Sequence, residues 1–272
     1  MPDLIRGKAT ICIVNYKTLD FTRLSLRSIR KFTNYPYETI VIDNDSQDES
    51  LEYLKSLNWI RLIERRSEAA EPRGGFTHGA ALDLGLENCN TEFFISMHSD
   101  VFIQKQNWLS KLISYFDNDE SIACVGSGKI ELTPNWRIFL KKTTDFRTLK
   151  RKLLCTPDPN GKFRYFNRTI CCIYRTEILR REQLSFLPDQ NKSLTSGKKL
   201  YFEVVDRGYK TVELPTFVMG QYIVHLAHAT QVVNPQEFTL RNKTIRKCNR
   251  LVDKIMSSEK NKNIIADSSL DE

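Results

Sequence analysis

No hydrophobic run in the sequence is long enough to cross a membrane. Apolar residues make up 40% of its 272 positions, but no run approaches the roughly 18 consecutive apolar residues that a transmembrane helix requires. The opening Met-Pro-Asp-Leu-Ile-Arg-Gly-Lys also lacks the apolar core of a secretory signal. We therefore expect a cytoplasmic protein that crosses no membrane.

Paired cysteines are missing as well. The seven cysteines are odd in number and no two of them have the C-x-x-C spacing, which argues against a zinc ribbon and against a disulfide framework. Four of them, Cys12, Cys124, Cys171 and Cys172, lie in apolar, strand-like runs, where cysteine packs as a small hydrophobic residue. This pattern predicts free thiols in a reducing compartment.

The chain also lacks an excess of acidic residues. Its 41 lysines and arginines against 33 aspartates and glutamates give a net charge of +8, which favours anionic partners such as sugar nucleotides, acidic glycans, lipid surfaces or nucleic acids. No recognised nucleic-acid-binding motif accompanies the charge, so we expect no nucleic-acid partner and keep that class as the weaker alternative. A nucleotidyltransferase is disfavoured because no glycine-rich signature lies near the first strand.

What the sequence does contain is an alternation of strand and helix patterns. Short apolar runs predict strands, and amphipathic runs between them predict helices. The expected strands are 9–14, 37–42, 59–63, 93–97, 122–125, 129–132, 169–174, 211–214 and 222–224, and the expected helices are 18–31, 46–57, 76–86, 108–116, 197–206 and 236–256. This order predicts an α/β fold with a mostly parallel central sheet flanked by helices and with a C-terminal helical extension.

Local signals predict where helices begin and end. The segments Ser46-Gln-Asp-Glu49 and Asn234-Pro-Gln-Glu237 have the spacing of a capping box, so each is expected to open a helix. Gly208 is expected to end the helix at 197–206 in left-handed backbone. The polar residues 257–272 are expected to be disordered.

The stretch Thr91–Ile103 carries the strongest candidate site. It contains a short apolar strand followed by His98 and Asp100, whose side chains would face the same side of an extended backbone. An imidazole beside a carboxylate suits a divalent ion such as Mn²⁺ and suits Mg²⁺ less well. Because carboxyl ends of parallel strands meet at one edge of a sheet, Asn15, Asp43 and the Gly74-Gly75 loop should converge there too. On this window alone, His98 and Asp100 could equally just begin a surface loop.

Four segments resemble, in order and spacing, the GT-A-fold glycosyltransferases of the family-2 type. They are Ile-Val-Asn15-Tyr, Val-Ile-Asp43-Asn-Asp-Ser-Gln-Asp48, Gly74-Gly-Phe-Thr-His-Gly79, and Ser-Met-His98-Ser-Asp100-Val in the place of the family's Asp-x-Asp motif. The resemblance covers residues 8–132 well and 168–228 loosely. It implies a Rossmann-like GT-A fold and metal-dependent transfer of a sugar from a nucleotide sugar, most naturally UDP-linked, to an acceptor.

The resemblance also implies roles for individual residues. Asn15 and Tyr16 would border the nucleotide base, and Asp43 would accept a hydrogen bond from a ring N–H of that base. Asp100 would hold a Mn²⁺ or Mg²⁺ ion, and His225, with His228 as the alternative, would complete the metal site. The expected donor-binding residues are Asn15, Tyr16, Asp43, Asn44, Arg73, Gly74, Gly75, His98, Ser99 and Asp100, and the expected metal ligands are Asp100, His98 and His225.

Two departures from the family pattern bear on catalysis. His98 replaces the leading aspartate, and its imidazole can bind the metal or donate a hydrogen bond to a phosphate. Ser196-Gly197 stands where the family has a Glu-Asp base motif, so Asp189 is the first candidate for the catalytic base. Weaker candidates are Asp158, Glu203 and Asp206. A catalytically silent relative that binds a nucleotide or a glycan is therefore the alternative function.

The chain is expected to divide by role. Residues 1–132 form the donor-binding half, 133–232 the acceptor-binding and catalytic half of the same domain, 233–256 an amphipathic helix and 257–272 the tail. Residues 134–165 interleave basic and aromatic side chains, and we expect them to form an acceptor-binding lid. The expected acceptor is a glycan, a lipid-linked molecule or a protein, and the basic segments allow peripheral contact with an anionic membrane.

Overall fold

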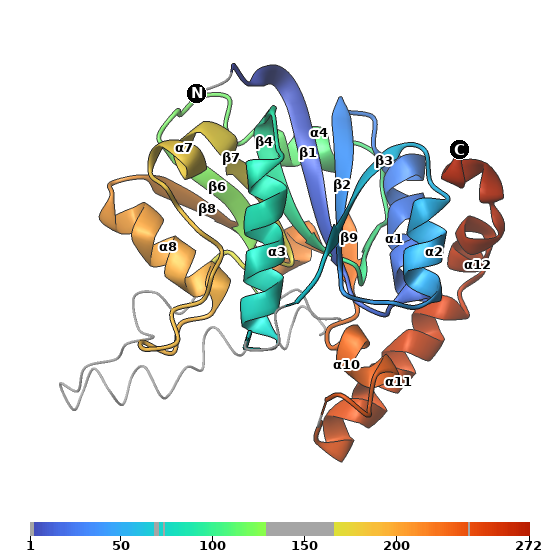
Figure 1. The fold of residues 1–272 in the computed structure, drawn as a ribbon. Helices are drawn as coiled ribbons and strands as arrows, with labels where there is room; N and C mark the ends of the chain where they lie inside the picture. The colour runs from blue at the N-terminus through green and yellow to red at the C-terminus, as the bar shows by residue number, and fades with distance from the viewer. Residues whose placement is uncertain (1–2, 68–70, 73, 129–165, 239) are drawn as a thin grey trace.

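The computed structural model describes residues 3–67, 71–72, 74–128, 166–238 and 240–272 (Figure 1). Its centre is a seven-stranded sheet with the strand order β3-β2-β1-β4-β7-β6-β8. The strands are β1 (Ile5–Asn15), β2 (Tyr37–Asn44), β3 (Ile60–Arg65), β4 (Thr91–His98), β6 (Ile122–Ser127), β7 (Cys171–Arg175) and β8 (Lys210–Leu214). Neighbouring strands are parallel except that β7 runs antiparallel to β4 and β6. The predicted mostly parallel α/β sheet is confirmed.

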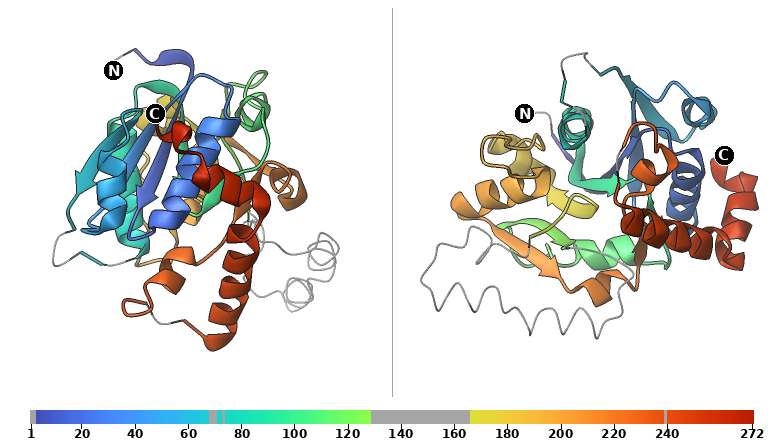
Figure 2. Two further views of the ribbon diagram at one scale, coloured as in Figure 1. Left: turned by 90° about the vertical axis from the view of Figure 1, so that its right-hand side faces the viewer. Right: turned by 90° about the horizontal axis from the view of Figure 1, so that it is seen from below.

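Both faces of the sheet are buried because its strands are apolar on both sides. In β1, Ile11 and Ile13 join one core cluster, while Cys12 and Val14 join the other. Helices cover the two faces, as Figure 1 and Figure 2 show. The first cluster is covered by α1 (Leu19–Phe32), α2 (Glu49–Lys55), α4 (Trp108–Ile113) and α9 (Thr216–Met219), and the second by α3 (Gly75–Glu87), α7 (Thr176–Arg181) and α8 (Ser196–Asp206).

A second, two-stranded sheet joins distant parts of the chain. Strand β5 (Val101–Ile103) pairs antiparallel with β9 (Ile223–His225), and this register sets Val101 opposite His225. The amide of Leu226 donates to the carbonyl of Asp100 at 3.2 Å and extends the pairing to the residue before β5. His225 is thereby held beside the end of β4.

The C-terminal segment is ordered, so the prediction of a disordered tail over 257–272 is wrong. After α10 (Ala229–Val233) and α11 (Asn242–Met256), the chain forms α12 (Glu259–Ala266) and a 3₁₀ turn at Ser268–Asp271. Ile264 is buried in a cluster with Phe21 and Leu24 of α1, and Figure 2 shows α12 beside α1. A few apolar positions and an ion pair with α1 fix a segment whose composition is otherwise polar.

Both predicted capping boxes are replaced by other contacts. At α2 the cap is Asp48, whose side chain accepts from the amide of Ser50, because the Ser46 hydroxyl instead donates to Asp43. The segment at 234–237 opens no helix, since α11 begins at Asn242 and Glu237 binds side chains of the β1 loop. The predicted stop at Gly208 is confirmed, with φ +84°.

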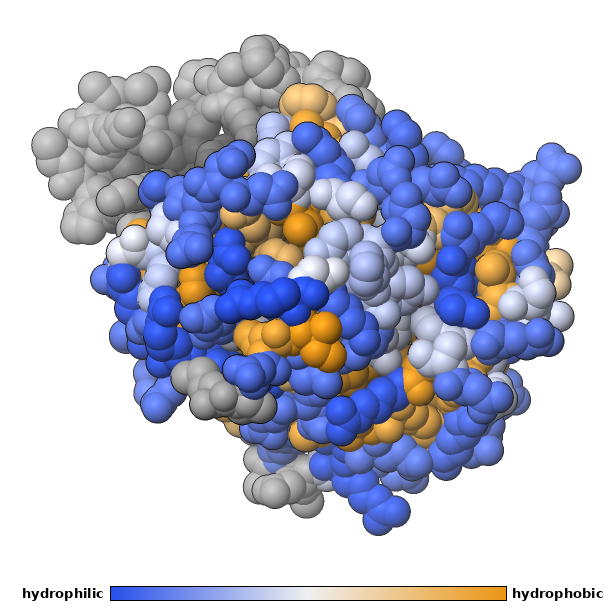
Figure 3. Space-filling model, turned by 90° about the horizontal axis from the view of Figure 1, so that it is seen from above, coloured by the Kyte–Doolittle hydropathy of each residue, from blue (hydrophilic) through white to orange (hydrophobic). Residues whose placement is uncertain are grey.

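Several expectations concern residues outside the described ranges: the strand at 129–132, the basic and aromatic stretch at 134–165, Arg73 and Asp158. Among the described residues, no helix is both long and apolar enough to traverse a lipid bilayer. The face at the amino ends of the parallel strands is mostly hydrophilic, with its hydrophobic residues in interrupted patches (Figure 3). The candidate site lies at the other end of the sheet.

Candidate functional site

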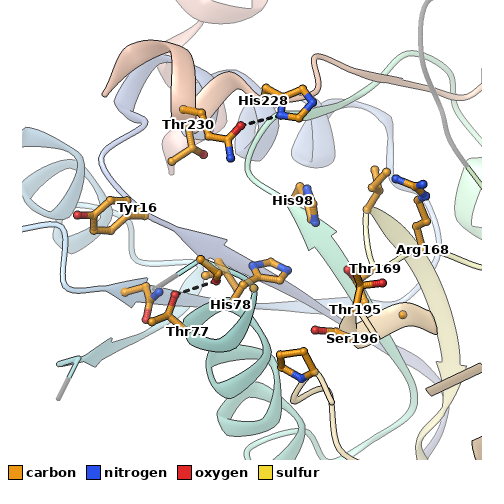
Figure 4. Close-up of a pocket in the computed structure, with 18 of the residues that line it drawn as sticks. Tyr16, Thr77, His78, His98, Arg168, Thr169, Thr195, Ser196, His228 and Thr230 are labelled. Atoms are coloured by element: carbon orange, nitrogen blue, oxygen red, sulfur yellow. Dashed lines mark hydrogen bonds between the residues drawn. The ribbon is translucent and has the colours of Figure 1, made fainter. Parts of the chain in front are cut away.

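A cavity of about 900 Å³ opens at the carboxyl ends of β1, β2 and β4, the edge at which open α/β sheets bind their ligands. Figure 4 shows His98 at the end of β4, between His78 on α3 and His228. Predicted site residues that line the cavity are Tyr16, Asn44, Gly74, Gly75, His98, Ser99, Asp100, Asp189 and His225. The structure therefore brings most of the predicted site together around one space.

Three potential metal ligands meet on the wall of this cavity. Nδ1 of His98 lies 3.8 Å from Oδ1 of Asp100, and Nε2 of His225 lies 3.3 Å from the same oxygen. One ligand atom from each of the three residues falls within 4.8 Å of the others. Ligands that share one ion at about 2.1 Å lie about 3 to 4 Å apart, so this spacing fits a single divalent cation.

The protonation states of His98 and Asp100 suit metal binding. Burial, with the neighbouring His78 as the next cause, lowers the pKa of His98 to about 3. Burial alone would raise the pKa of Asp100, but His225, together with His98 and the amide of Ala229, holds the pKa well below its ordinary value. His98 is thus a neutral imidazole and Asp100 a carboxylate at neutral pH, the forms in which each donates a lone pair to a metal.

Unsatisfied polar atoms point to the same conclusion. Within the described part of the chain, Nε2 of His98 is buried without a hydrogen-bond partner, and Oδ1 of Asp100 is buried with only the ring nitrogens of His98 and His225 beside it. Buried polar atoms nearly always have a partner, so atoms left unpaired at this spacing fit a bound divalent cation. The residues present therefore fit the divalent ion that the resemblance implies.

His78 is a wall residue that the sequence analysis did not assign to the site. Its ring packs edge-on against His98 with a centroid distance of 4.9 Å, and burial lowers its pKa to about 4. Its Nε2 atom is buried and has no partner among the described residues. His228, the alternative metal ligand, is instead engaged through Nδ1 with Oε1 of Gln231 at 2.7 Å.

The Gly74-Gly75 loop presents backbone to the cavity. Gly74 precedes the first residue of α3 and has φ +84°, a left-handed conformation that favours glycine. Among the described residues, no atom lies within 4 Å of where a Cβ would stand on either glycine. Since α3 has no acidic residue in its first turn and no side-chain cap, its N–H groups remain available to an anion such as a phosphate.

Asn15 and Asp43 are neighbours, but their side chains are occupied with each other. Nδ2 of Asn15 donates to Oδ1 of Asp43 at 2.8 Å, and both residues are almost fully buried. The hydroxyl and the amide of Ser46 also donate to Asp43. Neither Asn15 nor Asp43 is among the described residues that line the cavity. They fix the loop that carries Asn44 and Asp45.

Two glutamates line the cavity that the sequence analysis did not identify. Glu71 pairs with Arg65 at the end of β3. Glu237 accepts from the Tyr16 hydroxyl and from Nζ of Lys17, so the C-terminal segment closes over the end of β1. No motif marks Glu71 in the sequence, and the motif that contains Glu237 predicted a helix cap rather than a cavity residue.

The opposite end of the cavity contains the start of α8. Ser196 and Gly197 line it, and a Cβ on Gly197 would stand 3.0 Å from the carbonyl oxygen of Asn167. An acidic side chain at position 197 would therefore require the neighbouring backbone to shift. Asp189 is the carboxylate at this end, and its Oδ1 accepts from the amide of Lys192 at 3.0 Å.

Comparison with known proteins gives the family. Residues 10–181 match the family described as Glycosyl transferase family 2. An uncharacterized glycosyltransferase from Haemophilus influenzae is 24% identical over 118 residues, which are 43% of this chain and 35% of that protein. The match therefore spans about a third of the relative's length.

Solved structures share the fold. A mannosyltransferase from Pyrobaculum calidifontis, in complex with GDP-Man and Mn²⁺, aligns with a TM-score of 0.53 at 13% identity, over 99% of this chain and 81% of its own. The S. aureus protein TarS, residues 1–349 in complex with UDP, aligns with a TM-score of 0.52 at 14% identity, over 95% of this chain and 70% of its own. With the family match over more than half of its length, the chain belongs to glycosyl transferase family 2 and has the GT-A fold.

Proposed function

We propose that this protein transfers a sugar from a nucleoside diphosphate sugar, UDP-linked, to the hydroxyl group of an acceptor with the help of a divalent ion. The observation that carries the proposal is the convergence of His98, Asp100 and His225 within 4.8 Å beside a cavity at the carboxyl edge of the sheet. The fold relatives support it, since one was solved with UDP and another with GDP-Man and Mn²⁺.

The cavity offers a distinct subsite for each part of the donor. His98, Asp100 and His225 would hold the diphosphate through a divalent ion. The backbone amides at Gly74 and Gly75 would bind the remaining oxygens of the diphosphate. The nucleoside would lie toward β1 and β2, where Tyr16 and Asn44 form the wall, as in other sheets of this topology. The sugar and the acceptor would then lie toward Asp189 and α8.

The reaction requires charge stabilisation on one side of the sugar and a base on the other. The acceptor oxygen attacks the anomeric carbon, the bond from that carbon to the diphosphate breaks, and the acceptor proton passes to a carboxylate. A bound divalent ion would neutralise charge that grows on the leaving diphosphate. His98 and His225 would hold that ion while adding no negative charge next to the diphosphate.

Asp189 is the carboxylate that we assign as the base. The described carboxylates on the cavity wall are Asp45, Glu71, Asp100, Asp189 and Glu237. Asp100 belongs to the metal ligands. The other three lie at the nucleoside end: Asp45 follows β2, Glu71 pairs with Arg65 of β3, and Glu237 binds Tyr16 and Lys17 just after β1. Asp189 alone among them stands at the α8 end, where the family keeps its base.

Calorimetric titration tests the donor site. UDP, GDP and dTDP would each be titrated with and without Mn²⁺ into the wild type, Asp100→Ala and the control Asp206→Ala, which removes an exposed carboxylate of α8. We expect metal-dependent binding of one diphosphate, lost in Asp100→Ala and kept in Asp206→Ala. Failure of all three nucleotides to bind the wild type would reject the proposal.

The alternative function, a silent relative that only binds nucleotide or glycan, is supported by Ser196-Gly197 in place of the acidic motif. Hydrolysis of the bound nucleotide sugar separates the two, because water can take the place of the acceptor in an active transferase, whereas a protein that only binds leaves the bond to the diphosphate intact. Release that depends on Asp189 supports the enzyme. Tight binding without any release supports the silent relative.

The surface of α11 favours an acceptor at an anionic membrane. Lys243, Lys247, Arg250 and Lys254 are exposed at a spacing that places them on one side of the helix. Their charge would attract acidic lipid head groups and so bring a lipid-linked acceptor within reach. Co-sedimentation with acidic but not with neutral vesicles, lost when these four residues become glutamine, is the expected result.

A further inference from the structure

A carboxylate oxygen of a cavity-lining residue has no partner among the described residues. The side chain of Glu71 is 9% exposed, and its Oε2 atom is buried without a hydrogen bond to any described residue. The other oxygen, Oε1, accepts from Arg65. Because a buried acceptor without a donor is costly, this oxygen would gain by accepting an N–H group from a ligand in the cavity that Glu71 lines, once the carboxylate turns toward it.

Arg65 fixes the groups around this oxygen. It extends from the end of β3, is 13% exposed and donates from Nη1 to Oδ1 of Asn44 at 2.7 Å as well as to Glu71. Because Oδ1 of Asn44 accepts from Arg65, the side-chain N–H₂ group of Asn44 is the part that can donate to a ligand. The wall at the carboxyl ends of β2 and β3 therefore combines an acceptor on Glu71 that no described residue pairs with and a donor group on Asn44.

Asp43, which the family resemblance implies as the residue that reads the base, is already satisfied. Its two oxygens accept from the side-chain amide of Asn15 and from the hydroxyl and the backbone N–H of Ser46. The residue is 2% exposed. A base that used Asp43 would have to displace these donors. Glu71 offers the same chemistry without that cost.

We propose that Glu71 reads the nucleobase of the donor and selects uracil. The inference rests on the proposed function, because it assumes that a nucleoside occupies this end of the cavity. Uracil presents one ring N–H flanked by two carbonyl groups, which matches a single open acceptor with donors beside it. Guanine presents N–H groups on two adjacent nitrogens, but the second oxygen of Glu71 is held by Arg65. Cytosine and adenine present an unprotonated ring nitrogen, which the carboxylate repels.

Glu71→Gln is a sharp test because Arg65 dictates how the new amide is oriented. The guanidinium has only donors, so the glutamine oxygen will face Arg65 and its N–H₂ group will face the base. The acceptor at this position thereby becomes a donor. UDP should bind about 10- to 100-fold more weakly than to the wild type, while CDP, whose ring nitrogen now meets a donor, should bind more tightly.

The experiment is calorimetric titration of UDP, CDP and GDP with Mn²⁺ into the wild type, Glu71→Gln, Asp43→Asn and Glu64→Gln. Glu64 is the matched control, since it lies on β3 next to Arg65 but pairs with Lys55 on the exposed surface. The ratio of the UDP and CDP affinities is the readout, because it does not depend on the folded fraction of a variant. We expect wild type, Asp43→Asn and Glu64→Gln to favour UDP and Glu71→Gln to lose or invert the ratio.

Each contrary outcome has its own meaning. If the wild type favours UDP and Glu71→Gln keeps that ratio, or if Asp43→Asn alone changes it, the role of Glu71 is refuted and the proposed function stands. A wild type that binds the three nucleotides equally, or that favours GDP, refutes both the uracil assignment and the UDP-linked donor, while sugar transfer from another nucleotide sugar stands. A wild type that binds none of them overturns both proposals.

Discussion

The ion pair that anchors the last turn of the chain permits a quantitative prediction. Nε and Nη2 of Arg27 donate to the two oxygens of Asp271, and the Tyr53 hydroxyl donates to Oδ1 at 2.8 Å. Arg27 is 6% exposed. Replacing Asp271 by asparagine keeps the shape of the side chain but removes its charge and turns an N–H₂ group toward donors.

The expected cost follows from the burial of both partners. Breaking a buried pair by removing one charge costs about 3 to 5 kcal/mol, because the other charge stays buried alone. The side chain of Asp271 is 23% exposed, so solvent screens part of that energy. We therefore expect Asp271→Asn to lower the free energy of unfolding by about 2 to 3 kcal/mol, which for a chain of this size is a fall in Tm of about 5 to 10 °C.

Thermal and urea unfolding of Asp271→Asn should be compared with Asp267→Asn. Asp267 lies in the same segment and pairs with Lys31 at 4.0 Å, but both of those side chains are more than a third exposed, so its loss should move Tm by less than about 2 °C. If the two variants lost the same stability, or if Asp271→Asn matched the wild type, the argument that α12 is anchored by a buried ion pair would be wrong.

Three further predictions concern pH, packing and catalysis. The hydrogen bonds from Arg27 lower the pKa of Asp271 from its ordinary 3.8 even though burial opposes this. The pair therefore stabilises the protein above about pH 4. The difference in stability between wild type and Asp271→Asn should close as the pH falls further. Gly79→Ala would place a Cβ 2.4 Å from the carbonyl oxygen of Phe186 and should lower the free energy of unfolding in urea by about 1 to 3 kcal/mol. A Cβ on Gly75 meets no atom of a described residue within 4 Å, so Gly75→Ala should leave that free energy unchanged. Asp189→Asn should lower kcat about 100-fold or more and leave the calorimetric Kd of the donor unchanged; an unchanged kcat would remove Asp189 from catalysis.

The parts of the fold that depend on local pattern could be predicted from the sequence. The β-branched run at 9–14 appears as the middle of β1, and the apolar run at 93–97 as the buried part of β4. Because parallel strands present their carboxyl ends at one edge, the meeting of Gly74-Gly75 with His98 and Asp100 followed from the order of strands alone.

The details of the site depended on tertiary contacts that no local pattern contains. The hydroxyl of Ser46 had two competing uses, as a helix cap and as a donor to Asp43, and the buried network at the end of β1 and β2 was the stronger of them. Glu237 fitted a capping box in sequence, yet its carboxylate binds Tyr16 and Lys17 from across the molecule. Glu71 has no sequence signal, since its place on the wall is set by the pairing with Arg65.

The ordered tail was hidden by its composition. Only a few apolar residues, chiefly Ile264 and Ile265, interrupt the polar stretch from 257 to 272, and such a segment ordinarily cannot bury enough surface to become ordered alone. Its order comes from a partner surface that α1 already provides, including the buried guanidinium of Arg27. A sequence pattern shows which residues of a segment could be buried, but it does not show the surface on which they pack.

The pairing of β5 with β9 has a consequence for how the protein is made. His98 and Asp100 are synthesised with the first half of the chain, but His225 reaches them only when β9 has added to β5. A nascent chain that has already built the parallel strands β1 to β4 would still lack the third ligand of its candidate metal site. The growing polypeptide would therefore pass through most of its synthesis unable to hold the ion firmly, and the site would be completed late, as the C-terminal segment folds back.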